Sequence, residues 1–172
     1  MEAKVLANKI FKVIRVLEKN EGLALFVSLK KGFEDWLKVE LSGLLSNYRK
    51  VVVEGTHTIN SEKKRIDIVF NNEWAIELKD KKTNGKNVLD NLNDLKEAPY
   101  NIYNKTCLVF LTFHQYKKKG KDRTKTECDK SITSALEKNN KIYDKDFTYQ
   151  DFHFNNTKLK INNEGRLWFI LG

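Results

Sequence analysis

Residues 65–79 read RIDIVFNNEWAIELK, and hydrophobic side chains occupy every second position on both sides of the polar segment Asn71-Asn72-Glu73. This alternation predicts two short strands joined by a tight turn, a β-hairpin. Alternate side chains of a strand point to opposite faces of the sheet. One face of the hairpin is therefore suited to burial, and it carries Ile66, Ile68, Phe70, Trp74, Ile76 and Leu78.

The length of the turn determines which charged residues meet on the other face. With a three-residue loop, Phe70 pairs with Trp74, and Asp67 then lies opposite Glu77. Directly opposed residues have Cβ atoms about 4.5–5.5 Å apart, so the two carboxylates would repel each other unless a cation lies between them. A two-residue loop would shift the register by one residue and weaken this argument.

A divalent cation would remove the repulsion between the two carboxylates. Mg²⁺ is commonly held by one or two carboxylates together with waters and a substrate phosphate, and Mn²⁺ is able to substitute for it. Lys79 lies two residues beyond Glu77 and would direct its ammonium to the same place. The alternative is structural: Arg65 lies opposite Lys79 in this register, so both cations could form diagonal ion pairs with Asp67 and Glu77.

The spacing of these residues is similar to a known signature. Asp67, nine further residues and then Glu77-Leu78-Lys79 resemble the motif of the PD-(D/E)XK nuclease superfamily, which has the restriction-endonuclease-like fold. Ile66 stands where the motif has proline. The resemblance covers residues 33–113 and implies an α/β fold with a mixed sheet and an αβββαβ core.

The resemblance also implies a function and a set of site residues. It implies a Mg²⁺-dependent endonuclease of restriction, repair or defence type that hydrolyses phosphodiester bonds, in DNA rather than RNA. Asp67, Glu77 and the backbone carbonyl of Leu78 would hold the metal, while Lys79 would orient the attacking water or stabilise developing charge. The alternative is a catalytically inactive nucleic-acid-binding or accessory protein on the same fold.

Residues 33–45 show helical spacing, and Glu40 lies within the apolar stripe between Leu37 and Leu44. A carboxylate on an apolar face is costly unless it is paired, protonated or bound to a metal. In the superfamily the first helix often supplies an acidic residue to the active site, and Glu40 matches that role as a catalytic and metal-binding residue. The alternatives for Glu40 are a structural ion pair, or a helix rotated so that Glu40 lies at the edge of the stripe. Glu34 is the second candidate, but it lies off the stripe and is expected to be solvated.

A β-branched run, Val51-Val52-Val53, predicts the strand before the hairpin, and Glu54 closes it. Glu54 could serve as a metal ligand or orient a water, although an isolated glutamate at a strand end is more often a surface residue. Arg65 could pair with Glu54 or Glu77, or contact a phosphate of the nucleic acid.

The other sequence patterns predict further helices and strands that belong to a single domain with the hairpin. Residues 2–19 predict an amphipathic helix that packs on the sheet or on a second copy of the chain in a homodimer. Residues 107–111 predict a strand buried on both faces, and a crossover helix over 88–97 makes it parallel to an earlier strand. The expected organisation is an N-terminal helical region (1–31), the core (33–113), a basic loop (114–128) and a C-terminal helix with three strands (129–172).

The charge of the chain favours an anionic partner. The 172 residues include 32 Lys and Arg against 23 Asp and Glu, a net charge of +9, and this favours nucleic acid ahead of a membrane surface. A cluster in the basic loop could contact the phosphate backbone or simply be solvated. It consists of Lys117, Lys118, Lys119, Lys121, Arg123 and Lys125.

The two cysteines, Cys107 and Cys128, have neither metal-ligand spacing nor the pattern of a disulfide framework. They fit reduced thiols, so a cytoplasmic location is expected. The sequence has no apolar run of about 18 residues, so no membrane span is predicted and no membrane is expected as a partner.

Overall fold

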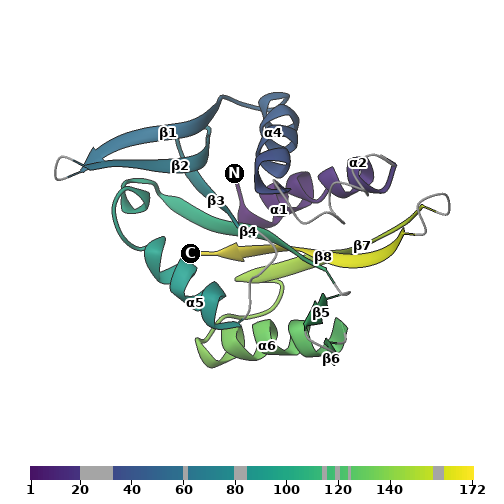
Figure 1. The fold of residues 1–172 in the computed structure, drawn as a ribbon. Coiled ribbons are helices and arrows are strands. Elements are labelled where there is room, and N and C mark those ends of the chain that lie inside the picture. Colours follow the sequence, from purple (N-terminus) through teal and green to yellow (C-terminus); the bar gives the residue numbers. More distant parts are fainter. Residues whose placement is uncertain are drawn as a thin grey trace.

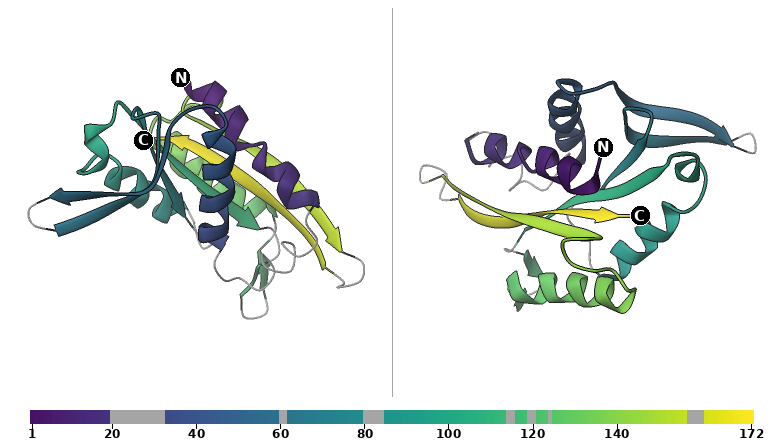
Figure 2. Two further views of the ribbon diagram at one scale, coloured as in Figure 1. Left: turned by 90° about the horizontal axis from the view of Figure 1, so that it is seen from above. Right: turned by 180° about the vertical axis from the view of Figure 1, so that it is seen from behind.

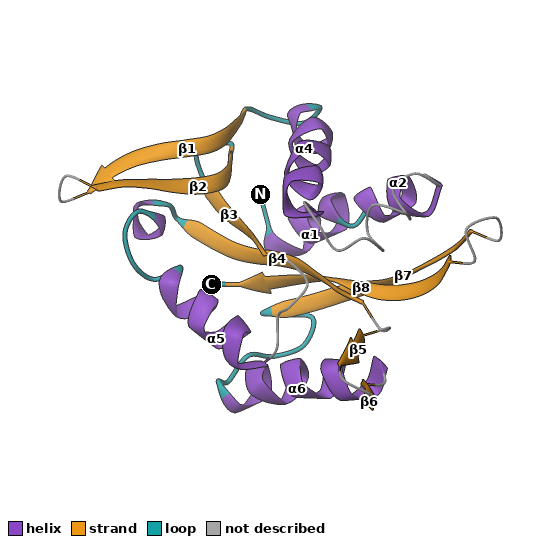
Figure 3. Cartoon of the chain, viewed as in Figure 1, coloured by secondary structure: helices purple, strands orange, loops and turns teal. Residues whose placement is uncertain are grey.

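A computed structural model describes residues 1–19, 33–59, 62–79, 85–113, 116–118, 121–123, 125–156 and 161–172. Within these ranges, a six-stranded mixed sheet lies between two layers of helices (Figures 1 and 3). The strand order is β1-β2-β3-β4-β8-β7. The strands are β1 (Val51–Ile59), β2 (Glu62–Phe70), β3 (Trp74–Lys79), β4 (Lys105–Phe113), β7 (Phe147–Asn156) and β8 (Ile161–Leu171).

The predicted hairpin forms from β2 and β3, with Phe70 paired to Trp74 across the three-residue turn. Asn71 and Asn72 both have positive φ angles, of 55° and 54°, a conformation that asparagine tolerates better than most residues. All six residues of the expected core face are buried. Ile66 packs with Val69 and Ala75 in a separate small cluster, rather than with the main core.

Strand β4 is buried on both faces, as predicted, and runs parallel to β3. Its side chains alternate between two hydrophobic clusters: Cys107, Val109 and Leu111 face one, and Leu108 and Phe110 face the other. The connection from β3 passes through helix α5 (Gly85–Asp94). This helix begins and ends three residues earlier than the predicted span of 88–97.

In the described residues, helices α1 (Ala3–Ile10), α2 (Val13–Lys19) and α4 (Phe33–Ser46) cover one face of the sheet. The single helix predicted over 2–19 is divided at Phe11 and Lys12. Here the backbone hydrogen bonds join residues three apart, as in a 3₁₀ helix, for example from Lys12 N–H to the Lys9 carbonyl. Both segments bury their apolar side against the sheet. Residues 20–32, which complete the predicted N-terminal region, lie outside the described residues.

The other face is covered by α5 and by α6 (Lys125–Lys138), which bury Val88, Leu92, Ile132 and Leu136. The C-terminal segment contributes two long antiparallel strands, β7 and β8, where three short strands were predicted. Residues 157–160 between them lie outside the described part of the chain. The expected basic loop contains a small hairpin formed by β5 (Tyr116–Lys118) and β6 (Lys121–Arg123).

Strands β1 and β2 extend beyond the rest of the sheet. They pair with each other as far as Ile59 and Glu62, whereas β2 pairs with β3 only between Ile68 and Phe70. The unshared part projects from the body of the molecule as a two-stranded ribbon (Figures 1 and 2). The residues at the base of this ribbon form the candidate site.

Candidate active site

Strands β2 and β3 separate at Asp67, and this opening defines the site. Their backbone ladder ends at the pair Ile68–Ile76. At the next step, where Asp67 was expected opposite Glu77, the Oδ2 atom of Asp67 accepts a hydrogen bond from the Leu78 N–H at 2.8 Å. At the open end of the hairpin, the Asp67 side chain therefore accepts the hydrogen bond that a backbone carbonyl would otherwise accept.

The predicted register does not continue past this opening. Arg65 pairs with Thr56 of β1, and Lys79 pairs with Phe110 of β4, so Arg65 and Lys79 belong to different ladders. The expected opposition of Arg65 and Lys79 is therefore not formed. Near this separation, a side chain from helix α4 contacts β2 and the neighbouring strand β1.

That side chain is Lys38. Its Nζ lies 2.8 Å from Asp67 Oδ1 and 3.3 Å from Glu54 Oε1. The side chains of Lys38 and Asp67 retain only 11% and 15% of their exposure. Arg65 Nη1 reaches the other oxygen of Glu54 at 3.4 Å. Lys38 thus connects helix α4 to strands β1 and β2, next to the point where β2 separates from β3.

Glu77 lies on β3 with both carboxylate oxygens occupied. Lys79 Nζ donates to Oε1, and the Tyr100 hydroxyl donates to Oε2. Burial raises the pKa of Glu77, and the negative charge of Asp67 raises it further, although Lys79 and Tyr100 act in the opposite direction. The charge of Asp67 therefore reaches Glu77 even though their backbones do not pair.

Glu34 on α4 is a further member of the group. Burial raises the pKa of Glu34, and repulsion from Asp67 adds to this rise, against the attraction of Lys79 and Lys38. Burial disfavours the charge on Lys79, but the hydrogen bond from Lys79 to Glu77 and the nearby carboxylates raise its pKa overall. The site therefore combines three carboxylates (Glu34, Asp67 and Glu77) with two ammonium groups, and repulsion among the carboxylates is only partly relieved.

Helix α4 does supply an acidic residue to the site, but the structure brings Glu34 there rather than Glu40. Residues along a helix are about 100° apart, so Glu40 leaves the helix roughly 200° away from Lys38, which faces Asp67. Glu34 lies one turn before Lys38 and shares its side of the helix. The buried line of α4 consists of Leu37, Leu41 and Leu45.

Glu54 is held in an unusual backbone conformation, with φ of 51°. A left-handed conformation in a non-glycine residue inside a strand is strained, and such strain is concentrated at functional sites. Glu54 occupies the place opposite Asp67, between the pairs Val53–Ile68 and Gly55–Ile66. Its carboxylate contacts Lys38 and Arg65, so the structure places this predicted residue at the edge of the group.

Two contributors were not found from the sequence, Lys38 and Tyr100. Lys38 follows Glu34 by four residues beside the Leu37–Leu41 line, and an i, i+4 charge pair next to a buried line is a usable signal. Tyr100 comes from the short 3₁₀ helix η1 (Tyr100–Ile102), and nothing local indicates its contact with Glu77. Burial raises the pKa of Tyr100, and Glu77 raises it further, so its hydroxyl remains a donor.

A hollow of about 270 Å³ lies beside the site, between the ribbon and the segment that leads to η1. Its lining includes Lys64 and Arg65 on one side and Asp94, Glu97 and Tyr100 on the other. Arg65 is 69% exposed at its side chain and is thus available to a ligand at this edge.

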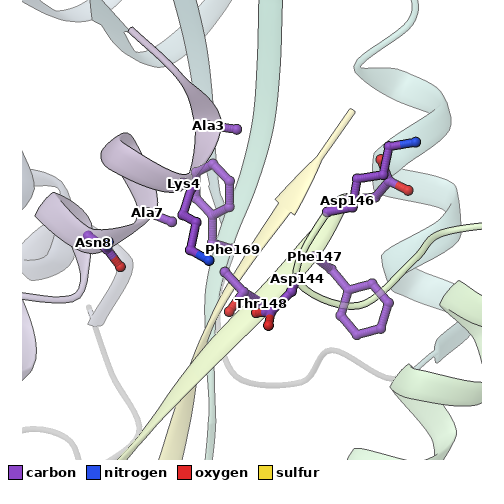
Figure 4. A pocket seen from close by; sticks show the side chains of 10 residues that line it. Ala3, Lys4, Ala7, Asn8, Asp144, Asp146, Phe147, Thr148 and Phe169 are labelled. Carbon is purple, nitrogen blue, oxygen red and sulfur yellow. The ribbon is translucent and has the colours of Figure 1, made fainter.

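The side chains of the basic cluster of residues 117–125 lie outside the part of the structure that is described. Lys119 lies outside the described residues, and the neighbouring residues form the β5–β6 hairpin and the start of α6. A second hollow, of about 90 Å³, lies between α1 and the β7–β8 strands, with Lys4, Asp144 and Phe169 in its lining (Figure 4). It shares no residue with the charged group around Asp67.

The carboxylate oxygens of the site suit a hard divalent cation. In the described part of the chain, no three His, Cys, Asp or Glu side chains are arranged to hold one ion. Mg²⁺, however, needs only one or two carboxylates beside waters and phosphate oxygens. Burial raises the pKa values of Glu34 and Glu77, and repulsion from Asp67 raises them further. A cation on Asp67 and Glu77 would relieve that repulsion.

No family model matches this chain, and neither a curated protein nor a solved structure shows significant similarity to it. Across the residues that the structure describes, none of the helices has the length and apolar character needed to cross a membrane. Inferences about function therefore rest on the geometry of the charged group.

Proposed function

We propose that this protein is a metal-dependent nuclease with a restriction-endonuclease-like core that hydrolyses phosphodiester bonds, in DNA rather than RNA. The observation that carries this proposal is the convergence of Asp67, Glu77 and Lys79 at the opening between β2 and β3. The element order supports the core: α4, three antiparallel strands, the crossover helix α5 and the parallel strand β4.

Asp67 and Glu77 would hold the Mg²⁺ ion, with the Leu78 carbonyl beside them. The ion would polarise the scissile phosphate and lower the pKa of water. Glu34 replaces Glu40 as the acidic residue contributed by α4, because it shares the charges of the group.

The other residues act through charge and hydrogen bonding. The Lys79 ammonium donates a hydrogen bond to Glu77. From this position it can stabilise negative charge that develops on the phosphate. Tyr100 fixes the orientation of the Glu77 carboxylate by binding its second oxygen. Arg65, exposed at the base of the ribbon, can bind a phosphate of the substrate strand.

One observation favours the alternative of a catalytically inactive nucleic-acid-binding or accessory protein. Asp67 and Glu77 are each paired with a lysine of the same chain, Lys38 and Lys79 respectively. An ion-pair network of this kind can be structural. The two proposals differ in metal binding, because a purely structural network should neither bind Mn²⁺ nor gain stability from it.

Cleavage of supercoiled plasmid tests the proposal. The wild-type protein is expected to nick or linearise plasmid only when Mg²⁺ or Mn²⁺ is present, and Asp67→Ala and Lys79→Ala should each abolish cleavage while remaining folded. Binding of DNA and metal without cleavage would favour a different nucleic-acid substrate or a missing partner. Absence of both metal binding and cleavage would favour the inactive alternative.

A further inference from the structure

We infer that Lys38 occupies the cation position on Asp67 in the metal-free protein, so that the Lys38–Asp67 ion pair and a bound divalent ion exclude each other. This inference rests on the proposed metal-dependent function and extends it to how the site is loaded. It assigns Lys38 a positioning role, distinct from the role of Lys79 beside Glu77.

Both oxygens of the Asp67 carboxylate already have partners in the structure. Its Oδ2 accepts the Leu78 N–H at 2.8 Å, and its Oδ1 lies 2.8 Å from Lys38 Nζ. Both oxygens are thus engaged by donors of the same chain. A cation that binds Asp67 must compete with one of them, and the ammonium is the donor on a flexible side chain.

The Lys38 ammonium lies in a buried position that suits a cation. Lys38 is 9% exposed, and its Nζ lies among carboxylates rather than at a surface where it could meet a phosphate. The carboxylates of Asp67 and Glu54 both face this ammonium and stabilise its charge. A fixed positive charge beside Asp67 opposes a second cation there.

Lys38 also has a second carboxylate partner, Glu54. Its Nζ already lies 3.3 Å from Glu54 Oε1, and the side chain of Glu54 is 47% exposed. An ion that displaces Lys38 from Asp67 therefore does not leave a buried ammonium without a carboxylate, which would be costly. The left-handed backbone of Glu54 is consistent with a carboxylate held for this contact.

Titration of the full-length protein with Mn²⁺ tests the inference without any substrate. Lys38→Gln keeps a hydrogen-bond donor for Asp67 but removes the charge, and it is expected to lower the Kd for Mn²⁺ about tenfold. Lys38→Arg keeps the charge and should bind Mn²⁺ no more tightly than the wild type. Lys130→Gln, an exposed site on α6, removes one charge elsewhere and should leave the Kd unchanged.

The gain in affinity separates this role from a structural one, because loss of a structural residue would weaken metal binding. If the wild type binds Mn²⁺ and folded Lys38→Gln binds it equally or more weakly, the inference is overturned while the metal site stands. If Lys38→Gln does not fold, a lower Kd in Lys38→Arg than in the wild type overturns it. If the wild type binds no Mn²⁺, the inference and the proposed function both fail.

Discussion

At the scale of single residues, burial and repulsion from Asp67 raise the pKa of Glu34. Its raised pKa means that the folded protein binds a proton more readily than the unfolded chain, in the range between the ordinary value of 4.5 and the raised value. Stability therefore falls as the pH rises through this range. At neutral pH, the charge of Glu34 is therefore expected to lower the free energy of unfolding of the wild-type protein.

Glu34→Gln should remove that penalty. The variant is expected to have a higher Tm than the wild type at pH 7, with the difference disappearing as the pH falls below about 4.5, where Glu34 is protonated in both states. Thermal unfolding at pH values from about 4 to 8 measures this, with Glu137→Gln on the exposed side of α6 as control. A lower Tm for Glu34→Gln at pH 7 would show that Glu34 is attracted, not repelled, in the site.

Tyr100 provides a second prediction at this scale. Its hydrogen bond lowers the pKa of Glu77, so Tyr100→Phe should raise that pKa further. Because cleavage is proposed to need ionised Glu77, the acid limb of the pH–rate profile should move to higher pH, and stability should fall by about 1–3 kcal/mol. Tyr103→Phe, which loses a contact to His57, is the control. An unchanged acid limb in Tyr100→Phe would remove Tyr100 from the site.

Two glycines test the packing of secondary structure elements. A Cβ at Gly85, the first residue of α5, would collide with the Ser131 backbone oxygen and lie 2.8 Å from Ala135 Cβ on α6. A Cβ at Gly43 in α4 would meet nothing within 4 Å. The two positions thus carry opposite expectations for the same substitution.

Gly85→Ala should lower the free energy of unfolding by about 1–3 kcal/mol, because α5 and α6 must move apart. Gly43→Ala should raise it by about 0.5–1 kcal/mol, because alanine favours an exposed helix interior. Denaturant unfolding of both variants measures the difference. Equal effects would mean that α5 does not pack closely on α6 at Gly85.

Several of the secondary structure elements could be predicted from the sequence. Period-two alternation predicted the β2–β3 hairpin and its three-residue turn, because a half-buried strand imposes that pattern. The apolar run of 107–111 likewise predicted β4. Glu34 was ranked behind Glu40, and Lys38 was missed, because the buried line of α4 runs through Leu45 and the predicted stripe was rotated by about one position.

Long-range contacts lay beyond prediction from the sequence. The hydrogen bond from Tyr100 to Glu77 joins residues 23 apart, and it depends on where the segment after α5 crosses the sheet. The β2–β3 ladder ends at Ile68–Ile76, next to Asp67, whose side chain accepts the Leu78 N–H and contacts Lys38 of helix α4. Local patterns contain neither kind of information.

At the scale of the whole molecule, the net charge of +9 predicts salt-sensitive binding of nucleic acid. Duplex DNA affinity should fall roughly a thousandfold between about 50 and 200 mM salt if about six phosphates are neutralised. Fluorescence anisotropy with a labelled duplex in EDTA measures this. Glu77→Gln should bind at least as tightly as the wild type, since it removes a negative charge. Affinity that does not change with salt would contradict an electrostatic interface.

The most direct measurement compares plasmid cleavage by the wild type, Glu77→Ala and the matched variant Glu137→Ala, each with Mg²⁺ or with EDTA. Glu77 is the test residue because it connects Lys79, Tyr100 and the charge of Asp67. The expected result is Mg²⁺-dependent cleavage by the wild type and Glu137→Ala, and none by folded Glu77→Ala. Near-normal cleavage by Glu77→Ala would contradict the assignment of the active site.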